Sequence, residues 1–176
     1  DDPFARRVLA HAEALFGDGA AADRLLEPLM AAGPNDAGLM YIKGMRHLTA
    51  AENDDDWEGQ SRIARDWLSR AHRADGNHYQ TLYRYAQSLR GEREFVSENT
   101  ANVMLLANQL APQVSEITMN AAMLLISRRQ YADAEALLRP LAADPHNAGL
   151  AQAARQLLQR ARRDPPATGE STPQSN

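Results

Sequence analysis

Apolar residues recur with helical spacing along most of the chain, most clearly in residues 131–150, YADAEALLRPLAADPHNAGL. Four of them follow the i, i+3, i+4, i+7 spacing of an amphipathic helix: Ala134, Leu137, Leu138 and Leu141. Asp144-Pro145 ends this helix, because proline disfavours helical geometry in the residue before it. Asn147 is placed to cap the next helix. The stretch therefore predicts the second helix of a hairpin and the start of the helix that follows.

A similar stretch lies near the other end of the chain. LLEPLMAAGPNDAGL, residues 25–39, matches LLRPLAADPHNAGL, residues 137–150, with one more residue in its loop. Pro28 and Pro140 fall at the same place inside the predicted helix, although an interior proline costs about 3 kcal/mol. Such a shared feature indicates an internal repeat.

The same spacing predicts four helix hairpins and a terminal helix within a repeat domain at 4–161. The hairpins cover about 4–32, 37–74, 78–110 and 114–143, and the terminal helix covers 148–162. Four alanines give a base period near 34 residues, since the intervals between them are 42, 37 and 33: Ala22, Ala64, Ala101 and Ala134.

Some boundaries are set by composition rather than by spacing. We interpret the acidic run 52–56, with 57–60, as a surface loop, and we expect the sixth helix to begin at Phe95. In the first helix, Phe4 to Phe16, the larger apolar residues share one side. The tail at 163–176 is rich in Pro, Ser and Thr and is predicted to be disordered.

Composition narrows the function. Net charge is −4, which gives no support to nucleic-acid binding, and no apolar stretch is long enough to span a membrane. The absence of cysteine excludes disulfides and thiolate chemistry. One lysine among 19 basic residues, with abundant alanine, favours a GC-rich bacterial source. The first residue is not methionine, so we expect a part or a processed form of a longer protein, cytoplasmic or periplasmic.

No catalytic or metal-binding motif emerges. None of the five histidines forms a pair one helical turn apart: His11, His47, His72, His78 and His146. The run 52–56 lacks the glycine and the distal glutamate of an EF-hand loop, so we interpret it as solvated, with docking of a basic partner as the functional alternative. We therefore expect neither catalysis nor a cofactor.

A helix–turn–helix repeat of this length resembles the tetratricopeptide repeat (TPR). The family's first-helix pattern is matched best by Leu82, Tyr85, Ala86 and Leu89, and less well by Thr118, Ala121, Ala122 and Leu125. Its second-helix pattern is matched by Tyr131, Ala134, Leu138 and Pro145. The resemblance implies an all-α fold, a right-handed α-solenoid of antiparallel helix hairpins with a concave surface. The terminal helix, with Gln152, Arg155, Gln159 and Arg162 on its polar side, would end the array.

The resemblance also implies a binding groove, since ligand contacts in this family come from positions two, five, nine and twelve of each first helix. In the third hairpin these are Gln80, Tyr83, Gln87 and Arg90; in the fourth, Glu116, Met119, Met123 and Ile126; in the second, the best matches are Ile42 and Arg46. Methionine adapts to irregular apolar partners, so a helix or an extended peptide is the expected ligand. The alternative for the methionines and Ile126 is packing against neighbouring helices. With Lys43 as the only lysine, we do not expect a clamp for chaperone C-terminal carboxylates.

Three functions remain open. The first is a non-catalytic scaffold that binds a peptide or helix of a protein partner in the groove, as part of a larger bacterial protein. The second is an accessory or substrate-docking domain of a fused or associated enzyme, such as a protease or transferase. The third is self-association through the terminal helix.

Overall fold

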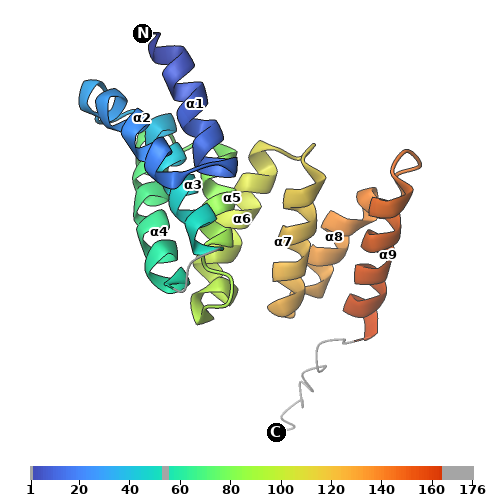
Figure 1. Cartoon of the computed structure of the whole chain (residues 1–176). Coiled ribbons are helices and arrows are strands. Elements are labelled where there is room, and N and C mark those ends of the chain that lie inside the picture. The colour runs from blue at the N-terminus through green and yellow to red at the C-terminus, as the bar shows by residue number, and fades with distance from the viewer. Residues whose placement is uncertain (1, 53–55, 164–176) are drawn as a thin grey trace, which may run out of the picture. The chain divides into compact units, whose positions relative to one another are not determined.

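The computed structural model describes residues 2–52 and 56–163. These residues form nine α-helices, one 3₁₀ helix and no strand (Figure 1). The all-α fold class predicted from the sequence is confirmed. The chain divides into two compact units, Asp1–Leu110 and Ala111–Asn176. Part of the predicted surface loop, residues 53–55, and most of the predicted disordered tail, residues 164–176, lie outside the described residues.

The first unit consists of helix hairpins packed on one another. In chain order its helices are α1 (Pro3–Phe16), α2 (Gly19–Ala32), α3 (Ala37–Ala51), α4 (Trp57–Ala74), α5 (Tyr79–Gln87), the 3₁₀ helix η1 (Arg93–Val96) and α6 (Glu98–Leu110). Helix α1 pairs with α2, α3 with α4, and α5 with α6. The pairs are joined because α3 also packs against α1 and α2, and α5 against α4.

The second unit holds the remaining three helices. They are α7 (Ser115–Ser127), α8 (Tyr131–Ala142) and α9 (Ala148–Arg163). Helix α8 packs against both of the others. The predicted polar side of the terminal helix is exposed at all four positions: Gln152, Arg155, Gln159 and Arg162.

Side-chain caps begin several of these helices. The carboxylate of Asp36 accepts the backbone N–H of Leu39 at 3.0 Å, at the start of α3. The amide oxygen of Asn147 accepts the backbone N–H of Leu150 at 3.1 Å, at the start of α9. Each bond satisfies one of the backbone donors that a helix leaves free at its first turn. The cap predicted at Asn147 is therefore confirmed.

Small residues allow the helices to approach closely. The four alanines that set the repeat period are all buried: Ala22, Ala64, Ala101 and Ala134. Gly44 has the same role in α3, because a Cβ atom there would lie 2.8 Å from Cγ of Leu68 in α4. The prolines at positions 28 and 140 both lie inside helices, as predicted. The repeated small positions therefore mark contacts between helices.

Two predicted boundaries are wrong. Helix α4 begins at Trp57 rather than after residue 60, because the Asp56 carboxylate caps it through the backbone N–H of Gly59 at 3.1 Å. Helix α6 begins at Glu98 rather than at Phe95, since Ser97 Oγ accepts the N–H of Thr100 at 3.2 Å. In both cases a polar residue that caps the helix decides where it begins, whereas apolar spacing alone misplaces the boundary.

Candidate functional site

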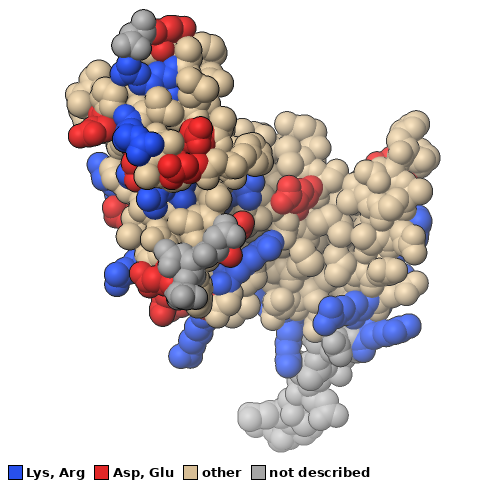
Figure 2. Space-filling model, viewed as in Figure 1, with Lys and Arg blue, Asp and Glu red and all other residues tan. Residues whose placement is uncertain are grey.

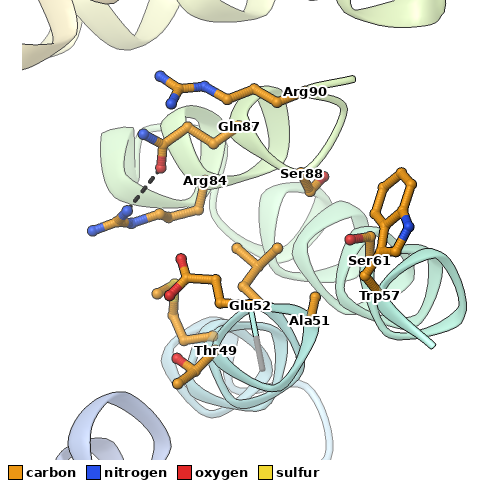
Figure 3. Close-up of a pocket in the computed structure, with 11 residues that line it drawn as sticks. Thr49, Ala51, Glu52, Trp57, Ser61, Arg84, Gln87, Ser88 and Arg90 are labelled. Atoms are coloured by element: carbon orange, nitrogen blue, oxygen red, sulfur yellow. Dashed lines mark hydrogen bonds between the residues drawn. The ribbon is translucent and has the colours of Figure 1, made fainter. Parts of the chain in front are cut away.

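A hollow of about 280 Å³ opens in the first unit between the end of α3, the start of α4 and the end of α5 (Figure 3). Its lining is partly apolar and partly charged: Met45, Leu48, Thr49, Ala51, Glu52, Trp57, Ser61, Arg84, Gln87, Ser88 and Arg90. Met45, Ser61 and Ser88 are buried, while Glu52, Trp57 and Arg90 are exposed at the rim. Ligands usually bind in concave sites where a few polar groups converge beside apolar side chains.

The arrangement of the hollow follows from where its three helices begin and end. The Asp56 cap starts α4 at Trp57, so that this indole lies next to the end of α3. Helix α5 ends after Gln87, and Ser88 Oγ then donates to the carbonyl of Tyr85 at 2.6 Å. In Figure 3, Arg84, Gln87 and Arg90 extend side by side from this end of α5, and Trp57 stands across the hollow from them.

Arg84 is held in place by several neighbours. Its Nη1 donates to Oε1 of Gln87 at 2.7 Å, and its guanidinium carbon lies 5.6 Å from the ring centroid of Tyr83. Burial raises the pKa of the Tyr41 phenol in α3, although the positive charge of Arg84 acts in the opposite direction. Contacts with two residues of its own helix therefore keep the Arg84 guanidinium at the side of the hollow.

Charge around the hollow is weakly positive. The lining contains two arginines, Arg84 and Arg90, against one carboxylate, Glu52. Near the end of α5, Arg65 donates to the Glu92 carboxylate at 2.6 Å and to the Ser88 carbonyl at 2.9 Å. Over the wider surface of this unit, basic and acidic side chains are interspersed on the face drawn in Figure 2. The arginines of the hollow are thus a local feature rather than part of a large basic face.

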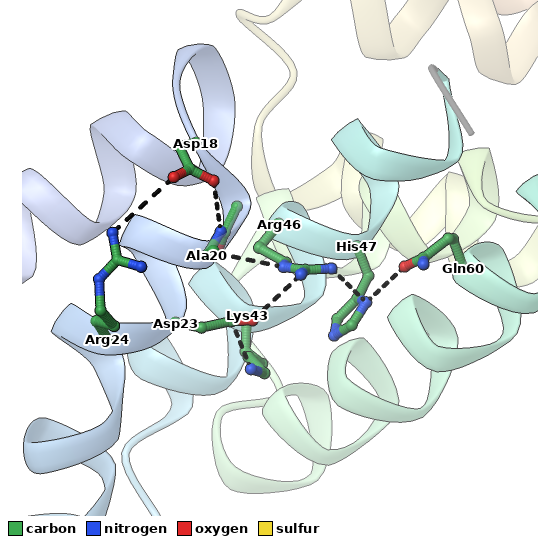
Figure 4. A network of polar contacts seen from close by, with 9 residues as sticks. Asp18, Ala20, Asp23, Arg24, Lys43, Arg46, His47 and Gln60 are labelled. Carbon is green, nitrogen blue, oxygen red and sulfur yellow. Dashed lines mark hydrogen bonds and ion pairs between the residues drawn. The ribbon is translucent and has the colours of Figure 1, made fainter.

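A polar network joins α2, α3 and α4 close to the hollow (Figure 4). The Asp23 carboxylate pairs with Nζ of Lys43 at 2.6 Å and with Nη2 of Arg46 at 3.2 Å. Nδ1 of His47 lies 3.2 Å from Nη1 of Arg46 and 2.8 Å from Oε1 of Gln60. Burial, and then the nearby Arg46 and Lys43 cations, lower the pKa of His47, which therefore favours the neutral imidazole.

The residues expected to line a groove have different surroundings in the first unit. Gln87 and Arg90 line the hollow, and Gln80 is half-buried at the start of α5. Tyr83 is only 4% exposed, so its ring packs inside the unit. Arg46 is engaged by Asp23, and Ile42, at 3% exposure, belongs to the core. The structure thus brings two of the predicted residues into one hollow, together with Arg84, Trp57 and Glu52.

Those three additional residues were missed by the sequence interpretation. Glu52 begins the acidic run and Trp57 directly follows it, and their region was assigned to a surface loop. Arg84 and Gln87 are three residues apart on a helix, a spacing at which side chains on a helix meet. That spacing is a signal from which Arg84 was predictable.

The second set of predicted residues belongs to α7, in the other unit. Glu116 and Met123 are exposed, with Met123 at 41%, while Met119 and Ile126 are half-buried. Met123 is therefore partly accessible on this helix. Among the described residues of both units, no group of histidine and carboxylate side chains has the arrangement to hold a metal ion. None of the helices in that part of the chain is long and apolar enough to cross a membrane.

Stacked helix hairpins of this kind define a helical repeat protein. The structure is similar to the crystal structure of a thermophilic TPR protein in Thermus thermophilus, with 20% sequence identity and a TM-score of 0.67. The likeness covers 90% of this chain and 82% of that one. No family model matches the sequence, and no curated protein matches it either. The chain therefore has a TPR-like fold, which confirms the resemblance inferred from the repeat pattern.

Proposed function

We propose that this chain is a protein-interaction scaffold rather than an enzyme, and that the hollow between α3, α4 and α5 receives a segment of a protein partner. The TPR-like fold supports the general role, because such repeats commonly present surfaces for partner binding. The observation that carries the finer assignment is the combination of an exposed indole, Trp57, with two arginines around one cavity. Tryptophan and arginine are the residue types most enriched at the energetic centres of protein interfaces.

The lining also indicates the chemistry of the ligand. Met45, Leu48 and Ala51 in the lining offer apolar contacts for one hydrophobic side chain of the partner. Arg84 and Arg90 favour an acidic group beside that side chain, because guanidinium groups form paired hydrogen bonds with carboxylates. We therefore propose a peptide or helix that carries an acidic residue next to an apolar one.

The exposed part of α7 is proposed as a second contact surface in the other unit. Met123, with Met119 and Ile126 beside it on the same helix, offers flexible apolar area, and Glu116 adds a charge. A Met123→Glu substitution separates this surface from the hollow. We expect it to weaken a partner that spans both surfaces and to leave a short peptide bound in the hollow unaffected.

The hollow can be tested with peptides selected from a displayed library on the full chain. The protein has two tryptophans, so Trp67→Phe leaves Trp57 as the only indole, and its fluorescence reports occupation of the hollow. We expect the selected peptides to share an acidic residue and to shift this fluorescence. Arg90→Glu should weaken their binding by about tenfold or more, since it places like charges together.

Arg73→Glu is the matched control, because Arg73 is exposed near the far end of α4 and makes the same change of charge. Circular dichroism must show that both variants remain folded. Tyr83 is unsuitable for such a test, since it is buried and its substitution would disturb the fold. Equal binding by wild type, Arg90→Glu and Arg73→Glu would exclude the hollow as the binding site.

A further inference from the structure

The outer side of α1 has an unusual surface, because every exposed residue of this helix is apolar or proline. These residues are Pro3, Phe4, Ala5, Val8, Leu9, Ala12 and Phe16. The four large ones are strongly exposed: Phe4 72%, Val8 51%, Leu9 55% and Phe16 88%. Two of the protein's three phenylalanines, Phe4 and Phe16, are thus exposed on this one helix. An apolar patch of this kind marks a surface that binds something.

Two polar residues of α1, Arg7 and His11, are instead directed toward the rest of the unit. Arg7 is half-buried and donates to the Asp36 carboxylate at 2.9 Å, and the His11 ring packs edge-on against Tyr41 with centroids 5.9 Å apart. Ala10 and Ala14 are the buried positions that contact the core. The usual pattern of a surface helix, apolar inside and polar outside, is therefore inverted on its solvent side.

Helix α9 gives a useful comparison within the same chain. Its buried positions are also mostly alanines, but its exposed residues include Gln152, Arg155, Gln156, Gln159 and Arg160. A polar outer side suits a helix that ends a stack of repeats in water. Helix α1 lacks such a side, so self-association is better placed at α1 than at the terminal helix.

We propose that the outer side of α1 packs against α1 of a second copy, antiparallel and about a two-fold axis at the level of Ala10. Successive helical residues are separated by roughly 100°, which places Phe4, Val8, Ala12 and Phe16 on one stripe. With the axis at residue 10, Phe4 of one copy lies opposite Phe16 of the other, and Val8 lies opposite Ala12. The stripe is thus complementary to itself, as a two-fold interface requires.

Charge complementarity supports a second copy of the chain as the partner and favours an antiparallel arrangement of the two α1 helices. Arg6 and Glu13, both half-buried, border the exposed side of α1 next to Leu9, seven residues and about two helical turns apart. In the antiparallel pair, Arg6 of each copy lies at nearly the level of Glu13 of the other, so two ion pairs border the apolar contact. A parallel two-fold pair would instead place the two copies' Arg6 and Glu13 residues at opposite edges of the contact, so neither ion pair would form. The Glu13 carboxylate already accepts the N–H of Asp18 at 2.9 Å through Oε2, and the proposed contact uses its other oxygen.

The test is the oligomeric state of the full 176-residue chain, measured by sedimentation equilibrium across a wide range of concentrations. We expect a monomer–dimer equilibrium in the wild type. Val8→Glu and Phe16→Glu should each weaken the dimer by about a hundredfold, because they place a charge within the apolar contact. Ile63→Glu is the control, since Ile63 is also a partly exposed apolar residue, 39% exposed, but lies on α4.

A charge exchange tests the antiparallel arrangement. Arg6→Glu and Glu13→Arg should each weaken the dimer by about tenfold, whereas the double variant restores both pairs and should dimerise nearly as wild type. Circular dichroism checks that each variant is folded. A wild-type chain that is monomeric at every concentration overturns the proposal, as does a dimer that survives both Val8→Glu and Phe16→Glu. Failure of the double variant to restore the dimer excludes the antiparallel pairing.

Discussion

Gly44 offers a direct test of how closely α3 and α4 must approach. A Cβ atom at this position would lie 2.8 Å from Cγ and 2.9 Å from Cδ2 of Leu68, and 3.4 Å from the carbonyl oxygen of Ala64. Carbon atoms in contact prefer about 3.5–4.0 Å, so the added methyl group overlaps its neighbours. Leu68 is fully buried and is surrounded on all sides, which leaves it little room to move away. We therefore expect Gly44→Ala to strain the contact between the two helices.

Two opposing effects set the size of the change. Alanine is favoured over glycine inside a helix by about 1 kcal/mol. Adding a methyl group to a well-packed core costs about 1–3 kcal/mol. Because the overlap involves Cγ of Leu68, close to its backbone, we expect the packing cost to prevail, with a net loss of about 1 kcal/mol in the free energy of unfolding.

A second substitution separates packing from other causes. Leu68→Ala alone should cost about 2–5 kcal/mol, because it leaves a cavity in the core. When it is combined with Gly44→Ala, the new methyl group at position 44 enters the space that the leucine side chain vacates. The two changes should therefore be less damaging together than the sum of the single effects, by roughly 1 kcal/mol or more.

Urea unfolding followed by tryptophan fluorescence measures these differences in the first unit, where Trp57 and Trp67 both lie. Gly149→Ala is the control for helix propensity. Its nearest neighbour for a new Cβ atom is Oδ1 of Asn147, at an unstrained 3.9 Å, so this change should stabilise α9, as measured by circular dichroism. If Gly44→Ala is stabilising to the same degree, or if the double variant shows strict additivity, the close approach of the helices does not depend on this glycine.

Two further predictions concern titratable residues. Burial is the main cause that lowers the pKa of three histidines below the ordinary 6.5: His11, His47 and His78. On acidification these histidines take up protons at a higher pH in the unfolded chain than in the folded one, so the free energy of unfolding should fall as the pH drops through 6.5. His47→Gln removes one of the three groups and should make this decline shallower. Urea titrations at a series of pH values measure the difference. Asp36→Ala removes the α3 cap and the Arg7 pair and should cost about 1 kcal/mol in urea unfolding; Asp36→Asn keeps a capping oxygen and should cost less. Equal losses for the two variants would show that the cap does not contribute.

The fold was predictable because the contacts between its helices require small residues at particular positions. Ala64, Ala101 and Ala134 are buried where helices meet, and a larger side chain there would separate the helices. Such positions recur along the chain, so the spacing between them is visible in the sequence. The prediction of α-helices was therefore correct for both units, and the resemblance to TPR proteins was inferred from the same positions.

Local boundaries were less predictable, because single hydrogen bonds decide them. Asp56 was interpreted as part of an acidic loop, yet its carboxylate caps α4 and adds a turn to that helix. Ser97 likewise starts α6 three residues later than the apolar residue Phe95 suggested. Aspartate and serine are common both as helix caps and in loops, so apolar spacing does not show which of the two roles such a residue has.

The lining of the hollow was only partly predictable, for a different physical reason. Carrying family positions over to the third hairpin assigns every fourth or third residue to one side, and two of these residues, Gln87 and Arg90, line the hollow. It fails to distinguish Tyr83, whose ring is buried, from Arg84, whose guanidinium lies beside the hollow and donates to Gln87. One residue is about 100° around a helix, and a small error in register exchanges an inward side chain for one at the edge of the hollow.

The two terminal helices show what the repeat pattern leaves undetermined. Helices α1 and α9 both bury alanines against their neighbours, so the pattern that defines the scaffold is alike in both. Their outer sides differ completely, with phenylalanine, valine and leucine on α1 and glutamine and arginine on α9. Packing within the unit does not constrain these outer residues, so their chemistry reflects what each helix meets outside its own unit. An outer side that is apolar along its whole length is therefore evidence for a partner, and the oligomeric state of Val8→Glu is the measurement on which that inference depends.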